Sequence, residues 1–344
     1  MPARAFITGL SGLAVTPEER AFLRDARPWG FILFKRNIES KAQVIRLVGE
    51  VLDELGAEAP VLIDQEGGRV QRLQPPVWPA YPPGAAYGAI YAKDKAKGLA
   101  AAKLGSRLIA ADLQELGINT DCLPLADVPV AGADPVVGDR AYGHEPAKVA
   151  AIAGAVAAGL IAGGVLPVLK HIPGHGRATA DSHARLPVVN AGRAVLEVTD
   201  FAAFRPLAAL PLGMTAHVVF TAIDPIAPAT VSATIVRGVI RDSIGFKGLL
   251  MSDDISMGAL SGSLAERTRS AIAAGCDMVL HCNGAMAEMQ AVAAAVPDLA
   301  GEAGRRAEAA LAAKQPAAPL DLAASRAEFL DLMSGAWQPA EPQA

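Results

Sequence analysis

Histidine and aspartate side chains gather in the stretch KHIPGHGRATADSH, residues 170–183. Pro173 and Gly174 lie within it and exclude a regular helix, because proline lacks a backbone donor and glycine weakens helices. The stretch is therefore predicted to be a loop that follows a short apolar strand. Near its end, Asp181 stands two residues before His183. It is close enough to accept a hydrogen bond from the ring, orient it and favour its protonated form. This pair is a candidate for acid and base chemistry.

The three histidines of this loop also allow a metal-binding interpretation, with Asp181 as a further ligand. His171 and His175 have the spacing of zinc ligands on a helix, but the proline and glycine between them prevent that helix. No His-Glu-x-x-His motif and no cysteine pair accompanies them. We therefore predict that the protein uses no metal and no cofactor. His171 can equally be a buried histidine whose hydrogen bonds are satisfied.

Two adjacent acidic residues, Asp253 and Asp254, end the apolar run GLLMSDD. A single aspartate after a strand often caps the next helix, and Asp254 is a candidate for that role. If Asp253 points into a site at the end of the strand, it is a candidate nucleophile or charge-stabilising group opposite the acid–base loop.

Carboxylate and guanidinium groups are closely spaced in DQEGGRVQR, residues 64–72. The paired glycines predict a tight turn, which can bring Arg69 or Arg72 back toward Asp64 so that both charges bind one polar ligand. A structural ion pair beside the turn is the alternative. A phosphate-binding loop is not expected, because both glycine spacings typical of such loops are absent. Arg140, in GDRAYG, is either a hydrogen-bond donor to a ligand or a solvated loop charge.

The whole chain alternates between apolar runs and helical patterns. This alternation predicts right-handed βαβ units, and eight strands favour closure into a single-domain (β/α)8 barrel of the TIM type, an α/β fold. A doubly wound open sheet is the alternative. The predicted strands are 5–8, 30–34, 60–64, 118–123, 165–170, 213–217, 248–252 and 277–281. The predicted helices are 17–26, 41–56, 93–117, 146–163, 196–210, 233–245 and 264–275.

The positions of the polar residues favour the barrel over the open sheet. They lie at or just after the carboxyl ends of many different predicted strands, which is where a barrel assembles its site. An open sheet would concentrate them at one switch point. These residues are Asp64, Asp121, Asp127, Lys170, His171, His217, Asp253 and Asn283.

The chain is predicted to consist of one catalytic domain and a short extension. The barrel is expected to occupy residues 1–298. The Ala-rich, charged stretch 299–337 is predicted to be a helical extension packed on the barrel, with a break at KQPAAP. Residues 338–344 are predicted to be a disordered tail, because they have little to bury.

Composition and charge argue against several classes of partner. The formal net charge is −4, and the Lys and Arg residues are scattered, so neither nucleic acid nor an anionic membrane surface is an expected partner. Glycines and a proline interrupt the uncharged stretch 149–169, which is therefore predicted to be a helix, a turn and a strand rather than a membrane span. The start, MPARAFITGLSG, lacks the features of a secretory signal, and the three cysteines form no CxxC pair. We expect a cytoplasmic monomer that binds a small molecule.

Taken together, these motifs resemble the landmarks of family 3 glycoside hydrolases, and within them the single-domain bacterial β-N-acetylglucosaminidases. The resemblance covers residues 31–283 and is poor in the tail that follows. Ile172 stands where the family commonly has phenylalanine. The matching segments, in chain order, are FILFKRN, IDQEGGRVQRL, LPLADV, GDRAYG, KHIPGHGRATADSH, MTAHVVF, SDDISMGAL and AGCDMVLHCN.

The resemblance implies a role for each candidate residue. It implies that Asp253 is the nucleophile and that His183 is the general acid/base, with Asp181 as its partner. Retaining glycoside hydrolysis needs an anion beneath the anomeric carbon and a proton donor near the leaving oxygen, and these residue types fit both needs. The residues implied to hold the terminal sugar are Asp64, Arg72, Arg140, Lys170 and His171.

The implied activity is exo-acting, retaining hydrolysis of terminal β-linked N-acetylglucosamine, from muropeptide fragments in cytoplasmic peptidoglycan recycling. The low aromatic content, 5%, leaves few platforms on which a long glycan could stack and agrees with an exo-acting pocket. A β-glucosidase or an N-acetylglucosaminide phosphorylase of the same fold is an alternative. A metal-dependent barrel hydrolase and a non-catalytic sugar-binding module are alternatives from other classes.

Overall fold

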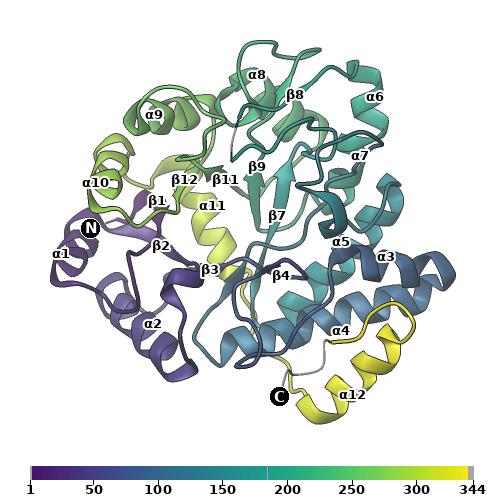
Figure 1. Cartoon of the computed structure of the whole chain (residues 1–344). Helices are drawn as coiled ribbons and strands as arrows, with labels where there is room; N and C mark the ends of the chain where they lie inside the picture. The colour runs from purple at the N-terminus through teal and green to yellow at the C-terminus, as the bar shows by residue number, and fades with distance from the viewer. Residues whose placement is uncertain (1, 184, 340–344) are drawn as a thin grey trace.

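The computed structural model describes residues 2–183 and 185–339. Within these residues, eight parallel strands close into a barrel in the order β1-β12-β11-β9-β7-β6-β3-β2, surrounded by helices (Figure 1). Each strand overlaps one of the predicted strands, so the predicted (β/α)8 barrel is confirmed. The open sheet is excluded because the first strand pairs with both the second and the last. The barrel strands are β1 (Arg4–Thr8), β2 (Pro28–Leu33), β3 (Val61–Ile63), β6 (Thr120–Asp121), β7 (Leu166–Ile172), β9 (Leu212–Thr215), β11 (Leu249–Asp254) and β12 (Met278–His281).

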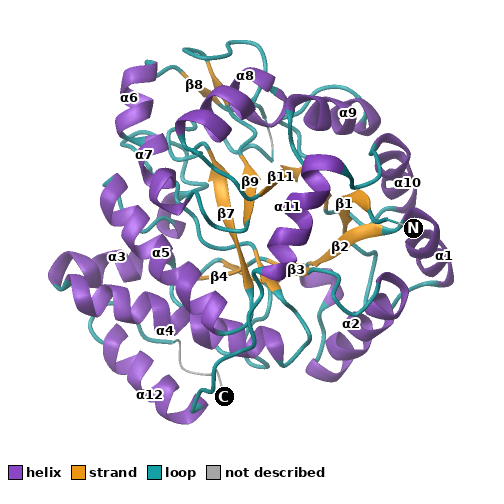
Figure 2. Cartoon of the chain, turned by 180° about the vertical axis from the view of Figure 1, so that it is seen from behind, coloured by secondary structure: helices purple, strands orange, loops and turns teal. Residues whose placement is uncertain are grey.

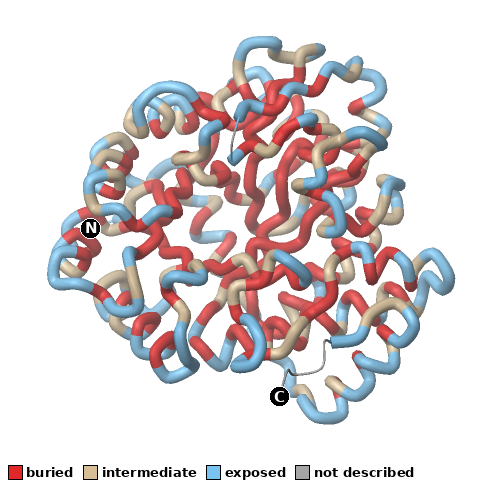
Figure 3. Tube along the Cα trace, in the orientation of Figure 1, coloured by how far each residue is buried: buried red, intermediate tan, exposed pale blue. Residues whose placement is uncertain are grey.

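The barrel strands are almost continuously apolar because both of their faces are covered. The sequences PWGFIL of β2, VLI of β3 and LGMT of β9 are buried at every position. Helices cover the outside of a parallel barrel and side chains fill its inside, so such strands lack the alternation of half-exposed ones. Figure 3 shows buried positions along the central strands and exposed positions on the outer helices.

Helices lie at all seven predicted ranges, and the pattern differs from the prediction in four places. The predicted helix 233–245 consists of α8 followed by a π-helix at Val236–Ser243. The predicted helix 196–210 is broken into α6 and α7 at Thr199, whose φ of −119° and ψ of −84° are not helical. A 3-10 turn at Arg205–Leu207 follows, where Pro206 cannot donate to a continuing helix. α3 and α10 were not predicted, because their apolar residues form no single stripe. The helices are α1 (Pro17–Ala26), α2 (Lys41–Leu55), α3 (Gly84–Lys93), α4 (Lys95–Gln114), α5 (Pro146–Ala162), α6 (Arg193–Val198), α7 (Asp200–Phe204), α8 (Ala233–Ile235), α9 (Leu264–Ala274), α10 (Met286–Ala295), α11 (Gly301–Ala312) and α12 (Leu322–Met333).

Local capping residues define where the first helix begins. The Thr16 hydroxyl accepts a hydrogen bond from the backbone of Glu19 at 3.1 Å, and the Glu19 carboxylate accepts one from the Thr16 backbone at 2.9 Å. This reciprocal arrangement satisfies donors that a helix start leaves free. The helix after the Asp253 strand, α9, begins in the same way at Ser263.

The end of the barrel that holds the strand starts is closed by α11 (Figure 2). Ala307 and Ala310 of this helix pack against a cluster of barrel-interior residues that includes Leu249 and Met251. Arg306, also in α11, donates to Asp277 at the start of β12, at 2.8 Å. The packed interior and α11 therefore separate this end from the carboxyl ends of the strands.

The C-terminal residues lead from α11 to α12, which packs against α4 on the outside of the barrel. Residues 299–337 contain α11 and α12, which flank the KQPAAP segment. Phe329 of α12 packs beside Tyr81 and Tyr87, with ring centroids 6.3 Å and 6.4 Å away. Of the predicted disordered tail 338–344, residues 340–344 lie outside the described residues. No helix in the described part of the chain is both long enough and apolar enough to cross a membrane.

Truncating a barrel-interior residue should destabilise the protein strongly. Leu249 is fully buried in β11, so Leu249→Ala leaves a cavity and should lower the free energy of unfolding by about 2–5 kcal/mol. Leu330→Ala, at a position on α12 that is 47% exposed, is the matched control and should change it by less than about 1 kcal/mol. Urea unfolding of the three proteins measures both effects. Equal losses in the two variants would contradict the described packing.

Candidate active site

The eight residues to which the sequence gave a role in catalysis or sugar binding all line one cavity of about 410 Å³. The cavity lies where the barrel strands end. Asp64 directly follows β3, Lys170 lies near the end of β7, and Asp253 lies near the end of β11. The other predicted residues in its wall are Arg72, Arg140, His171, Asp181 and His183.

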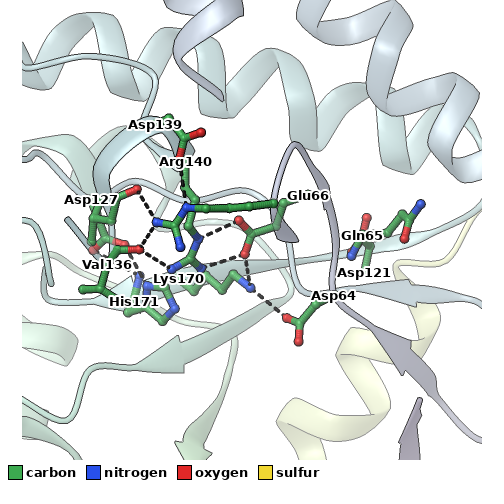
Figure 4. Close-up of polar contacts among 12 residues, drawn as sticks. Asp64, Gln65, Glu66, Asp121, Asp127, Val136, Asp139, Arg140, Lys170 and His171 are labelled. Atoms are coloured by element: carbon green, nitrogen blue, oxygen red, sulfur yellow. Dashed lines mark hydrogen bonds and ion pairs between the residues drawn. The ribbon is translucent and has the colours of Figure 1, made fainter. Parts of the chain in front are cut away.

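Charged side chains of alternating sign form a continuous array along this cavity. The Lys170 Nζ atom lies 2.9 Å from Oδ1 of Asp64 and 2.8 Å from Oε1 of Glu66. Glu66 also accepts two hydrogen bonds from Arg140, at 2.8 Å from Nε and 2.7 Å from Nη2. At the other end, Nη2 of Arg72 lies 2.8 Å from Oδ2 of Asp64. We call this array, Arg140–Glu66–Lys170–Asp64–Arg72, the ion chain, and Figure 4 shows its first four members.

The ion chain keeps its carboxylates ionised. Burial alone would raise the pKa of Glu66, but the neighbouring guanidinium and ammonium groups lower it to about 2. Burial is likewise outweighed at Asp64, where Lys170 and Arg72 hold the pKa well below its usual range. Burial would lower the pKa of Lys170, but the two carboxylates raise it. At neutral pH the cavity therefore presents fixed donors and acceptors, which suits a ligand rich in hydroxyl groups.

A short hairpin brings Arg72 to Asp64. Its strands are β4 (Gln65–Gly67) and β5 (Val70–Gln71). Gly67, the last residue of β4, and Gly68, which follows it, have positive φ angles of 98° and 57°. The predicted tight turn is thus confirmed, at positions where glycine adopts such angles most readily. The Gln65 side chain accepts a hydrogen bond from the Arg72 backbone at 3.0 Å. The other candidate, Arg69, instead pairs with an exposed aspartate.

Asp253 is a buried carboxylate at the end of β11. Its Oδ1 atom accepts a hydrogen bond from the Asp254 backbone at 2.8 Å. Burial would raise its pKa, but the imidazoles of His217 and His171 and this backbone donor hold the pKa below its usual value. Asp254 accepts from the backbone of Ser256 at 3.1 Å, so it caps a turn rather than the next helix. Asp253 is therefore an ionised carboxylate facing the cavity.

His183 and Asp181 form the predicted pair at the exposed side of the cavity. Nδ1 of His183 lies 2.7 Å from Oδ1 of Asp181, and the two side chains are 66% and 42% exposed. Burial would raise the pKa of Asp181, but hydrogen bonds from the His183 backbone and ring lower it. The backbones of Ser182 and His183 accept from those of Ala259 and Gly258, at 3.1 Å and 3.3 Å. The loop that carries the pair therefore contacts the loop that follows Asp253.

A second histidine–aspartate pair lies deeper in the site. Nδ1 of His171 lies 2.7 Å from Oδ2 of Asp127, which is fully buried (Figure 4). The backbone of His175 donates to the other oxygen of Asp127 at 2.6 Å. Burial would raise the pKa of Asp127, but these histidines lower it to about 2. Asp127 thus holds both the His171 ring and the start of the acid–base loop.

Lys170 and His171 both line the cavity, although neighbouring residues of a regular strand face opposite sides. The pairing of β7 with β9 shifts its register between Leu169 and Ile172. Such an irregularity interrupts the alternation and redirects side chains. It explains how two adjacent residues reach the same site.

The three histidines of the loop do not converge on a common point. His171 contacts Asp127 and His183 contacts Asp181, whereas Nε2 of His175 lies 3.3 Å from the Ser182 hydroxyl. In residues 2–183 and 185–339, no group of three or more His, Cys, Asp or Glu side chains is placed to hold a metal ion. That the reaction needs no metal or cofactor stays a prediction.

The profile of the family described as "Glycosyl hydrolase family 3 N terminal domain" matches residues 8–314. The chain belongs to glycosyl hydrolase family 3. This family 3 enzyme is 39% identical to a β-hexosaminidase of Alkalilimnicola ehrlichii over 279 residues. The aligned region covers 80% of this chain and 79% of the relative. Over 325 residues this chain is 34% identical to a β-hexosaminidase of Aromatoleum aromaticum, with 93% and 91% coverage.

Solved structures agree with this assignment. NagZ from Neisseria gonorrhoeae, in complex with N-trifluoroacetyl-D-glucosamine, superposes with a TM-score of 0.85 at 31% identity, over 97% of this chain and 99% of that one. A β-N-acetylhexosaminidase from Beutenbergia cavernae gives a TM-score of 0.77 at 30% identity, over 90% and 96% of the two chains. The family inferred from the motifs is confirmed, and the protein is a glycoside hydrolase.

Sequence reasoning assigned no role in the family 3 site to two of its acidic residues. Glu66 stands two positions after Asp64 in a motif already singled out, but its partners come from β7 and from the 3-10 turn Gly138–Arg140. Asp127 was noted only for its place after a strand. In contrast, His217 was noted in the same way but lies outside the cavity, where both ring nitrogens contact neighbouring oxygens. Spacing along the sequence did not indicate which of these residues contact the site and which lie outside it.

Removing the buried imidazole of His175 should change how stability depends on pH. Burial, with a contribution from the nearby His171, lowers the pKa of His175 from 6.5 to about 4. Between these values the unfolded chain binds a proton that the folded chain excludes, so the free energy of unfolding falls with falling pH, by about 1.4 kcal/mol per pH unit. His175→Gln should remove that part of the slope. Urea unfolding between about pH 7 and 5 measures it, and equal slopes in both proteins would contradict the assignment.

Proposed function

We propose that this family 3 enzyme is an exo-acting, retaining β-N-acetylhexosaminidase that hydrolyses terminal β-linked N-acetylglucosamine. One observation carries the proposal: a buried strand-end carboxylate, an exposed histidine–aspartate pair and the ion chain line the same cavity. Relatives named β-hexosaminidase, and the sugar derivative in the Neisseria gonorrhoeae structure, support the choice of an acetamido sugar.

In the proposed mechanism, Asp253 attacks the anomeric carbon as the bond from that carbon to the leaving oxygen breaks. His183 gives its proton to the leaving oxygen, and Asp181 stabilises the imidazolium through Nδ1. A covalent glycosyl ester on Asp253 results. A water molecule then loses a proton to His183 as its oxygen attacks the anomeric carbon, which releases Asp253 as a carboxylate.

Histidine replaces the second carboxylic acid of the usual glycosidase scheme. The hydrogen bond between Nδ1 of His183 and Asp181 orients the ring for its proposed role as the proton donor. The side chain is mostly exposed, and its loop contains several glycines. We propose that this loop moves during turnover to bring His183 to the leaving oxygen.

The burial of the ion chain supports an exo mode of action. Lys170 and Glu66, at its centre, are 3% and 4% exposed, whereas His183 at the other side of the cavity is 66% exposed. A sugar held by the buried groups has little room to continue beyond them, while its leaving group extends past His183 toward solvent. One terminal sugar therefore fits.

The cellular role is a further part of the proposal. We propose that the substrate is a muropeptide fragment and that the enzyme acts in cytoplasmic peptidoglycan recycling as a monomer. All the proposed site residues come from one chain, so a monomer can form a complete site. The cysteines Cys122, Cys276 and Cys282 are free and buried, which suits a reducing compartment.

Turnover of 4-nitrophenyl β-glycosides tests the proposed activity. With chelator present, the wild type should hydrolyse the N-acetylglucosaminide in strong preference to the glucoside. Asp253→Ala should lower kcat by about 10,000-fold, because no other group can form the ester. Faster hydrolysis of the glucoside would contradict the proposed specificity for an acetamido sugar. If neither glycoside is hydrolysed, the proposed function is wrong.

Trapping with a fluorinated sugar tests the identity of the nucleophile. The proposal expects a mass increment on the peptide that contains Asp253. Fluorine slows both formation and breakdown of the ester, but an activated leaving group speeds only its formation, so the ester accumulates. Inactivation without an adduct would instead favour attack by the acetamido group of the substrate.

Removing His183 should slow hydrolysis most for substrates whose leaving oxygen needs a proton. His183→Ala should lower kcat/KM by about 100- to 10,000-fold for a disaccharide substrate, whose leaving oxygen is a poor leaving group. For 4-nitrophenyl glycosides the fall should be less than about 10-fold, since kcat/KM reports the first step and this phenolate leaves unaided. His144→Ala, at an exposed histidine outside the cavity wall, is the control. Similar losses on both substrates would refute the acid role.

A further inference from the structure

We infer that Glu66 is a positioning residue that holds Lys170 and Arg140 in the orientation in which they grip the terminal sugar. The inference rests on the proposed function and goes beyond it, because it assigns a task to a residue that contributes no reacting atom. Glu66 lies in β4, its side chain is 4% exposed, and it lines the cavity.

The carboxylate of Glu66 contacts only side chains that belong to the site, within the described residues. Within the described residues, the hydrogen bonds and ion pairs of its carboxylate all go to Lys170 and Arg140. Oε1 receives Lys170 Nζ at 2.8 Å and Arg140 Nη2 at 2.7 Å, while Oε2 receives Arg140 Nε at 2.8 Å. Both of its partners also line the cavity. A carboxylate whose partners all belong to the site acts on the site first and on the rest of the fold second.

These contacts determine which donors are left for a ligand. An ammonium group has three donors. Lys170 donates one hydrogen bond to Asp64 at 2.9 Å and forms an ion pair with Glu66 at 2.8 Å. A guanidinium has five N–H donors. Arg140 uses one on Nε and one on Nη2 for Glu66, and one on Nη1 for the Val136 carbonyl at 3.2 Å. The remaining N–H groups of both cations are aimed by the carboxylate between them. A sugar hydroxyl that meets them finds donors already in place.

The charge of Glu66 matters as much as its shape. Lys170 and Arg140 are two buried cations on either side of it, and each disfavours the charge of the other. A glutamine at position 66 would keep one acceptor oxygen but remove the anion between them. The two cations would then repel each other, and at least one would leave its present position.

Glu66→Gln tests the inference, with Asp277→Asn as the matched control. The control removes the charge of another buried carboxylate that pairs with two arginines, but at the strand-start end of the barrel and outside the cavity wall. Glu66→Gln should lower kcat/KM by about 30-fold on the 4-nitrophenyl and disaccharide substrates alike, because it weakens the grip on the sugar rather than proton transfer. It should weaken binding of N-acetylglucosamine, measured by calorimetry, by a similar factor. The control should lower the midpoint of thermal unfolding but leave kcat/KM and sugar affinity within about twofold of the wild type.

A double-mutant cycle separates positioning from a general structural defect. If Glu66 acts partly through Arg140, adding Glu66→Gln to Arg140→Ala should cost clearly less than Glu66→Gln costs alone. Glu66→Asp keeps the charge but withdraws the oxygens, and it should show an intermediate loss of sugar affinity. If Glu66→Gln does not fold, the sugar affinity of Glu66→Asp decides whether Glu66 has the positioning role.

The outcomes distinguish this inference from the proposed function. If the wild type hydrolyses the acetamido glycoside but Glu66→Gln or a folded Glu66→Asp binds the sugar as tightly as the wild type, the positioning role is wrong and the function stands. Full additivity in the cycle also overturns it. If the wild type neither hydrolyses the glycoside nor binds N-acetylglucosamine, the proposed function fails, and the inference fails with it.

Discussion

The buried ammonium group of Lys170 is the contact on which the arrangement of the site depends. It lies near the end of β7 with its side chain 3% exposed, between the carboxylates of Asp64 and Glu66. A buried ammonium without partners would lose its hydration without replacement, at a cost of several kcal/mol. The segment after β3 must therefore lie against the end of β7, and Arg140 and Arg72 follow as partners of the two carboxylates. Buried ion pairs of this kind are weak evidence for stability, and here they determine position.

The cavity combines a fixed side with an exposed side. On the fixed side, Lys170 and Glu66 at the centre of the ion chain and the Asp127–His171 pair are buried, and each is held by several contacts. On the exposed side, His183 and Asp181 depend on each other and on backbone contacts to the loop after β11. This division suits the proposed mechanism, in which rigid groups bind one sugar and a mobile loop brings the proton donor to the leaving oxygen.

The barrel makes this division possible. Its closed sheet brings the carboxyl ends of β3, β7 and β11 to one rim, so groups far apart in the chain share one cavity. α11 packs across the opposite end, and the apolar interior fills the space between them. Stability and chemistry are therefore located at different ends of the same strands, as expected for this architecture.

The strands, the barrel and eight of the residues that line the cavity could be predicted from the amino-acid sequence. Apolar runs and their spacing depend on neighbours along the chain, and the motifs around Asp64, His183 and Asp253 carried the family. Which charged side chains meet could be seen only in the folded structure. Glu66 lies beside Asp64 in the sequence, yet its task depends on Lys170 and Arg140, which reach it from distant segments. Pairing of this kind is set by the closure of the barrel and by the cost of burying an unpaired charge, and neither is visible in local spacing.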